Sequence, residues 1–220
     1  MEIKTIEVGE NLLAENSKIA EENSVLLKEK GIVSFNLMGS PGSGKTKILE
    51  RTLFNLKKDF PIGVIEGDIA GSYDSERLKG SDIPVVQINT GGACHLEALM
   101  IKKGLENLPL DEIKILFVEN VGNLVCPAEF ELGITKNVIV SSITEGEEKA
   151  AKYPLMFRIS HLCLLNKIDL VEHVLFDIKK FEEYVHNVNS GLKIFKVSAE
   201  TGENFNLWLE YIKSLINGKS

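Results

Sequence analysis

The residues best suited to chemistry stand together at Gly39–Thr46, where the chain reads GSPGSGKT. This segment matches in full the pattern G-x-x-x-x-G-K-S/T of phosphate-binding loops. Its glycines allow the backbone to curl so that successive N–H groups point at one anion. Lys45 can reach the β- and γ-phosphates, and Thr46 can bind Mg²⁺, so the segment predicts a nucleoside triphosphate site. The residues expected to contact the nucleotide are Gly39, Ser40, Gly42, Ser43, Gly44, Lys45 and Thr46.

A second motif indicates the base. Asn166, Lys167 and Asp169 form N-K-x-D directly after the apolar run His161–Leu165. The carboxylate of Asp169 can accept hydrogen bonds from the ring N–H and the amine of guanine, whereas adenine offers neither donor there. The motif therefore favours GTP over ATP. The last apolar run is followed directly by Ser198, Ala199 and Glu200. These three residues resemble the S-A-K/E segment whose backbone contacts guanine.

Bound Mg²⁺ needs oxygen ligands beyond Thr46. Glu119 ends the run Ile115–Val118 and resembles the acidic residue of a Walker-B strand. Asp68 is the last residue of the segment Glu66-Gly67-Asp68, which ends another predicted strand, and Asp74 follows in the segment expected to form a switch loop. The candidate Mg²⁺ ligands are Thr46, Asp74 and Glu119. The alternative is that the acidic residues are merely exposed loop residues, and this alternative is strongest for Asp68 and Asp74. The candidate catalytic residues are Lys45, Asp68, Asp74 and Glu119.

The sequence contains no recognisable water-positioning glutamine and no arginine finger. These two elements account for much of the rate of fast GTPases. We therefore expect slow intrinsic hydrolysis, with the missing element supplied by a second subunit.

Cys94, His95 and Cys126 form a second group of reactive side chains. Cys94 and His95 follow the run Val85–Ile88 and are expected near the N-terminus of a helix that extends to about Glu106, which favours a thiolate. Cys126 lies in the loop after the Walker-B-like strand. Both segments leave the carboxyl edge of the same predicted sheet. Two thiolates and an imidazole suit Zn²⁺ or Ni²⁺.

Three ligands leave a tetrahedral site one ligand short. Two such surfaces that meet across a twofold axis would supply the deficit, so the hypothesis is a metal-bridged homodimer. The alternative is that Cys94 and Cys126 are small buried hydrophobic residues and that His95 is unrelated to them. Cys163 lies inside an apolar run and is expected in the core.

A scaffold must position these residues, and the hydrophobic pattern predicts one. Seven apolar runs alternate with helical segments, and their hydrophobicity is continuous, which is typical of strands covered on both faces. We therefore predict an α/β P-loop domain with a mostly parallel sheet of about seven strands flanked by helices, and ligands bound beyond the carboxyl ends of the strands. The runs are Ile32–Met38, Ile62–Glu66, Val85–Ile88, Ile113–Glu119, Asn137–Ile143, His161–Leu165 and Lys193–Val197.

Two segments flanking the first of these runs are expected to be helical. One is Lys47–Lys58, which follows the phosphate loop. The other is residues 10–30, in which two apolar positions recur every seven residues until Gly31 ends the helix. We predict that residues 1–30 form a helix packed on a single P-loop domain at 31–220, with self-association of the helix as the alternative.

Composition narrows the class of protein. Hydrophobic residues make up 44% and charged residues 26%, and the net charge is −7 with no dense Lys/Arg cluster, which argues against a nucleic-acid surface. No apolar run approaches the ~18 residues of a membrane span. Three cysteines without framework spacing, and an N-terminus without secretory features, lead us to expect a cytoplasmic protein.

Taken together, these motifs resemble the HypB family of GTPase accessory proteins for nickel insertion into NiFe hydrogenase. The resemblance covers nearly the whole chain, and its most specific parts are Cys94–Ala98, which reads CHLEA, and Glu119–Pro127, which reads ENVGNLVCP. Residues 1–30 contain no Cys or His, so the sequence resembles the shorter form that lacks the N-terminal nickel motif of many bacterial members.

The resemblance implies a P-loop fold of the SIMIBI class, slow GTP hydrolysis and GTP-promoted dimerisation. It also implies a Zn²⁺ or Ni²⁺ site near the dimer interface, with Cys94, His95 and Cys126 as ligands. The partners that it implies are a HypA-type metallochaperone and the hydrogenase large subunit.

We therefore expect GTP and Mg²⁺ to order residues 68–74 and thereby to change both dimerisation and metal affinity. One alternative is a urease-type nickel GTPase, against which the absence of a Cys-Pro-His segment argues. Another is a small-molecule kinase that uses the same phosphate loop, which N-K-x-D disfavours. A third is a nucleotide-gated binding module without physiological catalysis.

Overall fold

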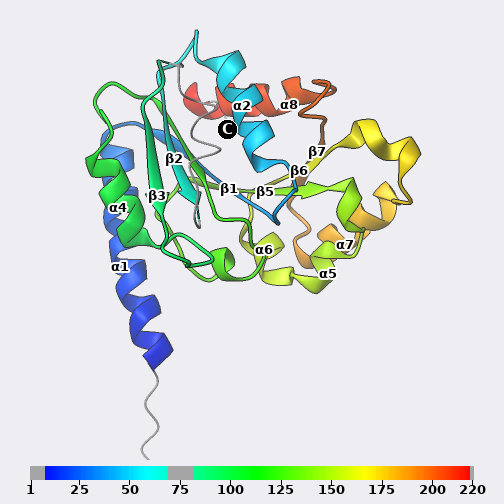
Figure 1. The fold of residues 1–220 in the computed structure, drawn as a ribbon, viewed down its shortest axis with the longest axis horizontal. Coiled ribbons are helices and arrows are strands. Elements are labelled where there is room, and N and C mark those ends of the chain that lie inside the picture. Colours follow the sequence, from blue (N-terminus) through cyan, green and yellow to red (C-terminus); the bar gives the residue numbers. More distant parts are fainter. Residues whose placement is uncertain (1–7, 69–81, 219–220) are drawn as a thin grey trace, which may run out of the picture.

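The computed structural model describes residues 8–68 and 82–218, with side chains from residue 12 onward. Its centre is a seven-stranded sheet in the order β3-β2-β4-β1-β5-β6-β7, and every neighbouring pair is parallel (Figure 1). The predicted α/β class and parallel sheet are therefore confirmed, and each strand lies within two residues of its predicted bounds. The strands are β1 (Val33–Met38), β2 (Ile62–Asp68), β3 (Val85–Asn89), β4 (Ile115–Glu119), β5 (Lys136–Ser142), β6 (Leu162–Asn166) and β7 (Lys193–Lys196).

Helices cover both faces of the sheet, which explains why the central strands are continuously apolar. Helices α2 and α8 pack on one face, where Trp208 and Phe35 form the centre of the core. The opposite face is covered by α1 and α4 over β2 and β4, and by α6 and α7 over β5 and β6. Cys163 is fully buried, which confirms that this residue belongs to the core, and the burial raises the pKa of its thiol. The helices are α1 (Val8–Glu29), α2 (Lys45–Leu56), α4 (Ala98–Glu106), α5 (Lys149–Lys152), α6 (Pro154–Ile159), α7 (Ile178–Val188) and α8 (Phe205–Ile216).

Strand β1 occupies the point at which the chain changes direction across the sheet. From β1 the chain crosses to β2 on one side, whereas β5, β6 and β7 follow one another on the other side. The loop after β1 therefore emerges where connections diverge, which is the position that ligands occupy in open parallel sheets.

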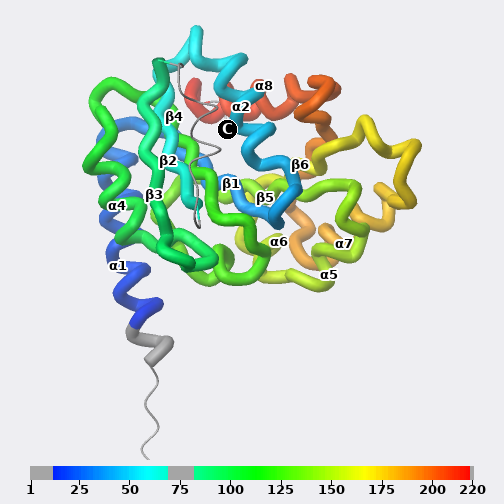
Figure 2. Tube along the Cα trace, in the orientation of Figure 1, coloured from blue at the N-terminus to red at the C-terminus, as the bar shows by residue number. Residues whose placement is uncertain are grey.

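The N-terminal helix α1 is fastened to the domain by two buried asparagines. Asn16 accepts a hydrogen bond from the backbone N–H of Ala98 at 2.8 Å, and Asn23 donates to the carbonyl oxygens of Ala98 and Leu132 at 2.9 and 3.1 Å. Figure 2 shows α1 beside α4 and its N-terminal end projecting beyond the other helices and strands. Within 8–68 and 82–218, no helix is long and apolar enough to cross a membrane.

The helix expected to open in the segment 90–96 and to extend to about Glu106 ends as predicted but begins later, because α4 begins at Ala98. The hydroxyl of Thr90 donates to the carbonyl of Ala93 in a tight turn, and Glu97 is extended with φ −110° and ψ 159°. An extended residue cannot continue a helix. Cys94 therefore lies in a loop ahead of α4.

Candidate functional site

The phosphate loop connects the end of β1 to the start of α2, as the motif requires. Lys45 is the first residue of α2, and its ammonium donates to the carbonyl oxygens of Gly39 and Ser40, both at 3.2 Å. Gly44 has φ +98°, and a Cβ there would lie 2.3 Å from Nδ2 of Asn166. Only glycine satisfies both the positive φ and this close approach.

A cleft of about 280 Å³ opens beside this loop. At its base the Thr46 hydroxyl donates to Oε1 of Glu119 at 2.6 Å, so the structure brings two predicted Mg²⁺ ligands together. These are hard oxygen donors, which fit Mg²⁺. Asp68 lines the same cleft, whereas Asp74 lies outside the described residues. The cleft is lined by Pro41, Gly42, Lys45, Thr46, Glu66, Gly67, Asp68, Gln87, Glu119, Asn120, Val121 and Gly122.

Two of the residues in this cleft were missed as candidates from the sequence. Glu66 is buried and lines the cleft from β2, and Gln87 lines it from β3. Alternate residues of a strand share a face, so the spacing of Glu66 and Asp68 was the available signal. A larger cavity of about 630 Å³ lies at the opposite edge of the sheet, beside Pro61 and Pro84, and no predicted site residue lines it.

The predicted base-recognition residues adjoin the phosphate loop. Asn166 ends β6, where it donates to the carbonyl of Ser43 and accepts from the N–H of Ala199, both at 3.0 Å. Lys167 donates to the carbonyl of Gly42 at 2.7 Å. Among the residues that the structure describes, Oδ1 of Asp169 is a buried atom without a hydrogen-bond partner. An acceptor in that condition fits a ligand that brings donors, as guanine does.

Residues 198–200 are held in place by helix α2. Arg51 donates from Nε to the carbonyl of Ala199 and from an η nitrogen to the carbonyl of Glu200, both at 2.6 Å. Lys47 forms an ion pair with the Glu200 carboxylate at 3.2 Å. No sequence pattern indicates a role for Arg51, because its partners lie about 150 residues further along the chain.

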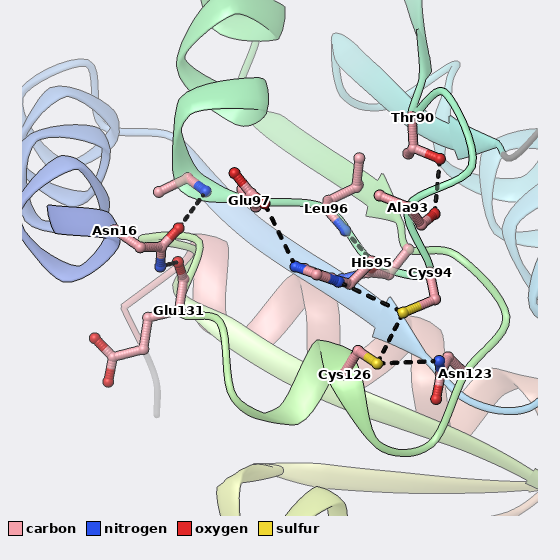
Figure 3. Close-up of polar contacts among 12 residues, drawn as sticks. Asn16, Thr90, Ala93, Cys94, His95, Leu96, Glu97, Asn123, Cys126 and Glu131 are labelled. Carbon is pink, nitrogen blue, oxygen red and sulfur yellow. Dashed lines mark hydrogen bonds and ion pairs between the residues drawn. The ribbon is translucent and has the colours of Figure 1, made fainter. Parts of the chain in front are cut away.

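The second group of predicted residues also converges. Possible ligand atoms of Cys94, His95 and Cys126 all lie within 4.8 Å of one another, and each residue is half-buried (Figure 3). Sγ of Cys94 lies 2.8 Å from Sγ of Cys126 and 3.7 Å from Nδ1 of His95. Two sulfurs and one imidazole form a donor set that fits Zn²⁺ or Ni²⁺.

The surroundings of the cluster affect its protonation. Burial lowers the pKa of His95, although the nearby Glu97 and Glu129 oppose the shift. This shift favours the neutral imidazole, which is the form that binds metal. The hydrogen bond with Cys94 and burial raise the pKa of Cys126, so metal binding must displace thiol protons.

Neighbouring side chains orient the cluster, and no sequence pattern indicated them. The ring of His95 stacks on Phe130 with centroids 4.0 Å apart, and its Nε2 lies 3.7 Å from Oε1 of Glu97. Asn123 donates to Sγ of Cys126 at 3.4 Å (Figure 3). Such contacts fix the rotamers of metal ligands.

The loop that bears Cys126 rests on the phosphate loop. The N–H of Asn123 donates to the carbonyl of Gly39 at 3.1 Å, which forms an isolated β-bridge. Gly122 approaches Pro41 so closely that a Cβ would lie 3.0 Å from its ring. One segment, residues 119–126, therefore runs from the cleft to the cluster and is hydrogen-bonded to the phosphate loop on the way.

Comparison with known proteins agrees with this geometry. Residues 33–196 match the family described as CobW/HypB/UreG, nucleotide-binding domain. The chain is 44% identical over 211 residues to hydrogenase maturation factor HypB of Escherichia coli, which covers 96% of this chain and 73% of that protein. It is 40% identical over 214 residues to the probable hydrogenase maturation factor HypB of Methanocaldococcus jannaschii, which covers 97% of both.

A solved structure shows the same fold. The crystal structure of HypB from Helicobacter pylori in complex with nickel has a TM-score of 0.88 and 34% identity, and the match covers 93% of this chain and 96% of that one. The predicted SIMIBI class of P-loop fold is therefore confirmed. The family match and the extent of these similarities show that the chain belongs to the HypB family.

Proposed function

We propose that this protein hydrolyses GTP and uses its nucleotide state to control a Ni²⁺- or Zn²⁺-binding site formed by Cys94, His95 and Cys126. The observation that carries the proposal is the continuous segment 119–126, which contacts Thr46 at one end and bears Cys126 at the other, with a hydrogen bond to Gly39 between them. Loss of the γ-phosphate on hydrolysis can therefore displace the thiol of Cys126 through this one segment.

The cleft supports hydrolysis by electrostatic stabilisation and positioning. Lys45 and the N–H groups of the loop stabilise negative charge on the β- and γ-phosphates. Thr46 and Glu119 would hold Mg²⁺, which would supply further charge neutralisation. Asp68 lines the cleft and orders the attacking water. Asp169 and the backbone of residues 198–200 select guanine.

The biological role that we propose is nickel delivery during hydrogenase maturation. The names of the relatives and the nickel in the H. pylori structure support this role. A homodimer promoted by GTP and metal supplies the ligands that three residues leave missing. By family membership we propose a HypA-type metallochaperone and the hydrogenase large subunit as partners.

A competitive chelator titration tests the proposal. Ni²⁺ and Zn²⁺ affinities are measured with GDP and with a non-hydrolysable GTP analogue, and light scattering follows the oligomeric state of the same samples. We expect affinities that differ by at least about fivefold between nucleotides, which is the lower range of measured allosteric coupling. Equal affinities in the two states would refute the control of metal binding by nucleotide.

Two variants make the assignment specific. Cys126→Ala should lose metal binding and keep GDP binding, because Cys126 does not line the nucleotide cleft. The matched control is Cys163→Ala, which removes a cysteine buried in β6 and should keep both. Metal binding retained by Cys126→Ala counts against this cluster as the site.

A further inference from the structure

Asn120, the residue directly after β4, has no role in the chemistry described so far, yet each polar atom of its side chain is engaged. It is 1% exposed. Its Oδ1 accepts from the N–H of Leu96 at 3.2 Å and from the N–H of Val121 at 2.9 Å, and its Nδ2 donates to Oδ1 of Asn36 at 3.2 Å. One oxygen thus holds the start of its own loop and a backbone N–H that lies 24 residues before Asn120 in the sequence.

The two segments are those that carry the metal ligands. Leu96 directly follows His95, and Val121 begins the stretch that leads to Cys126. The residue before Asn120 is Glu119, whose carboxylate accepts from Thr46 in the nucleotide cleft. Asn120 is therefore the point where the carboxyl end of β4 meets both ligand-bearing loops.

The orientation of this amide is fixed. Asn36 is also buried, and its own Nδ2 donates to Oδ1 of Asn137 on β5 at 3.0 Å, which leaves its oxygen facing Asn120. A rotation that exchanged the oxygen and nitrogen of Asn120 would set an NH₂ group against two N–H donors. The loops therefore follow any displacement of Asn120, because separating from it leaves buried donors unpaired.

We propose that Asn120 is the positioning residue that couples the nucleotide cleft to the Cys94, His95 and Cys126 cluster. The inference rests on the proposed function and adds the residue that transmits the nucleotide state. It contrasts with a purely structural role, in which Asn120 stabilises the fold and leaves the coupling unchanged.

The test measures the ratio of Ni²⁺ dissociation constants with GDP and with a non-hydrolysable GTP analogue. In Asn120→Ala, measured with each nucleotide at a saturating concentration because Asn120 also lines the cleft, we expect this ratio to fall to about 1, the value for uncoupled sites. The matched control is Asn16→Ala, because Asn16 is also a buried asparagine and accepts from the N–H of Ala98, the first residue of α4, two residues after Leu96. This control should keep the wild-type ratio.

A second test uses the wild-type protein, so its result does not depend on whether a variant folds. Amide hydrogen exchange, resolved by residue, should change at Leu96 and Val121 between the two nucleotides, whereas the Ala98 amide held by Asn16 should not change. A wild-type ratio of 1 overturns the proposed function and this inference together. A coupled wild type overturns only the inference if Asn120→Ala keeps its ratio, or if the Leu96 and Val121 amides do not respond.

Discussion

Replacement of Arg51 by alanine provides a direct test of the proposed guanine site. Arg51 lies on α2 and holds the loop at residues 198–200 by two hydrogen bonds of 2.6 Å to the carbonyls of Ala199 and Glu200. Its guanidinium also lies 5.8 Å from the centroid of the Phe205 ring. Arg51→Ala removes all three contacts while the phosphate loop keeps its sequence.

The size of the effect follows from the burial of the two acceptors. Ala199 is 1% exposed, so loss of the partner of its carbonyl costs about 1–3 kcal/mol. Glu200 is exposed, and water can replace the lost bond to its carbonyl. If residues 198–200 must be ordered to bind guanine, the same ~1–3 kcal/mol is lost from the free energy of GDP binding. The dissociation constant of GDP then rises by about 5- to 150-fold.

The assay is a titration with fluorescent GDP, accompanied by thermal unfolding without nucleotide. The control is Lys47→Ala, which removes an exposed ion pair to Glu200 on the same loop and should change the dissociation constant by less than about fivefold. The reasoning is refuted if Arg51→Ala is folded and binds GDP as tightly as the wild type, because residues 198–200 would then have no part in recognising the base.

Two further predictions follow from the site. Asp169→Asn should weaken GDP binding by about 10²–10⁴-fold, because two hydrogen bonds to a carboxylate are lost. The same variant should bind the xanthine nucleotide more tightly, because the xanthine carbonyl can accept a hydrogen bond from the new amide. An unchanged preference for guanine in a nucleotide titration would contradict this role of Asp169. Burial lowers the pKa of His95, so the unfolded chain binds this proton more tightly than the folded protein, and stability without metal should fall as the pH drops below about 6.5. The lowered pKa of His95 favours the neutral imidazole and the raised pKa of Cys126 favours the thiol, so Ni²⁺ binding at pH 7.5 should release the proton of Cys126 and none from His95. Calorimetry in buffers of different ionisation enthalpy counts the released protons, and more protons than two thiols can supply would show that His95 is still charged.

The sheet could be predicted from the sequence because burial on both faces leaves a simple mark. Runs such as Ile113–Glu119 are apolar without alternation, and each described strand lies within two residues of its run. The convergence of Cys94 with Cys126 could also be predicted, since both loops leave the carboxyl edge of one parallel sheet. Asp74 lies outside the described residues and stays a prediction.

The supporting contacts could not be predicted from the sequence. Phe130, Arg51 and Asn120 act through partners that lie far away along the chain or in irregular loops, where no periodic pattern exists. The start of α4 at Ala98 was missed for a related reason, because the turn at Thr90 and the hydrogen bond from Ala98 to Asn16 depend on tertiary contacts.

The hydrogen bond between Asn123 and Gly39 has a consequence for the direction of control. Coupling between two equilibrium binding sites is reciprocal, so a nucleotide that changes metal affinity by some factor requires the metal to change nucleotide affinity by the same factor. The nucleotide affinity of the proposed GTPase site would therefore depend on whether the metal ion is bound. Under the proposed coupling, the metal-bound protein and the metal-free protein prefer different nucleotides. The bound metal ion, and not only the rate of GTP hydrolysis, would then determine when the ion is released.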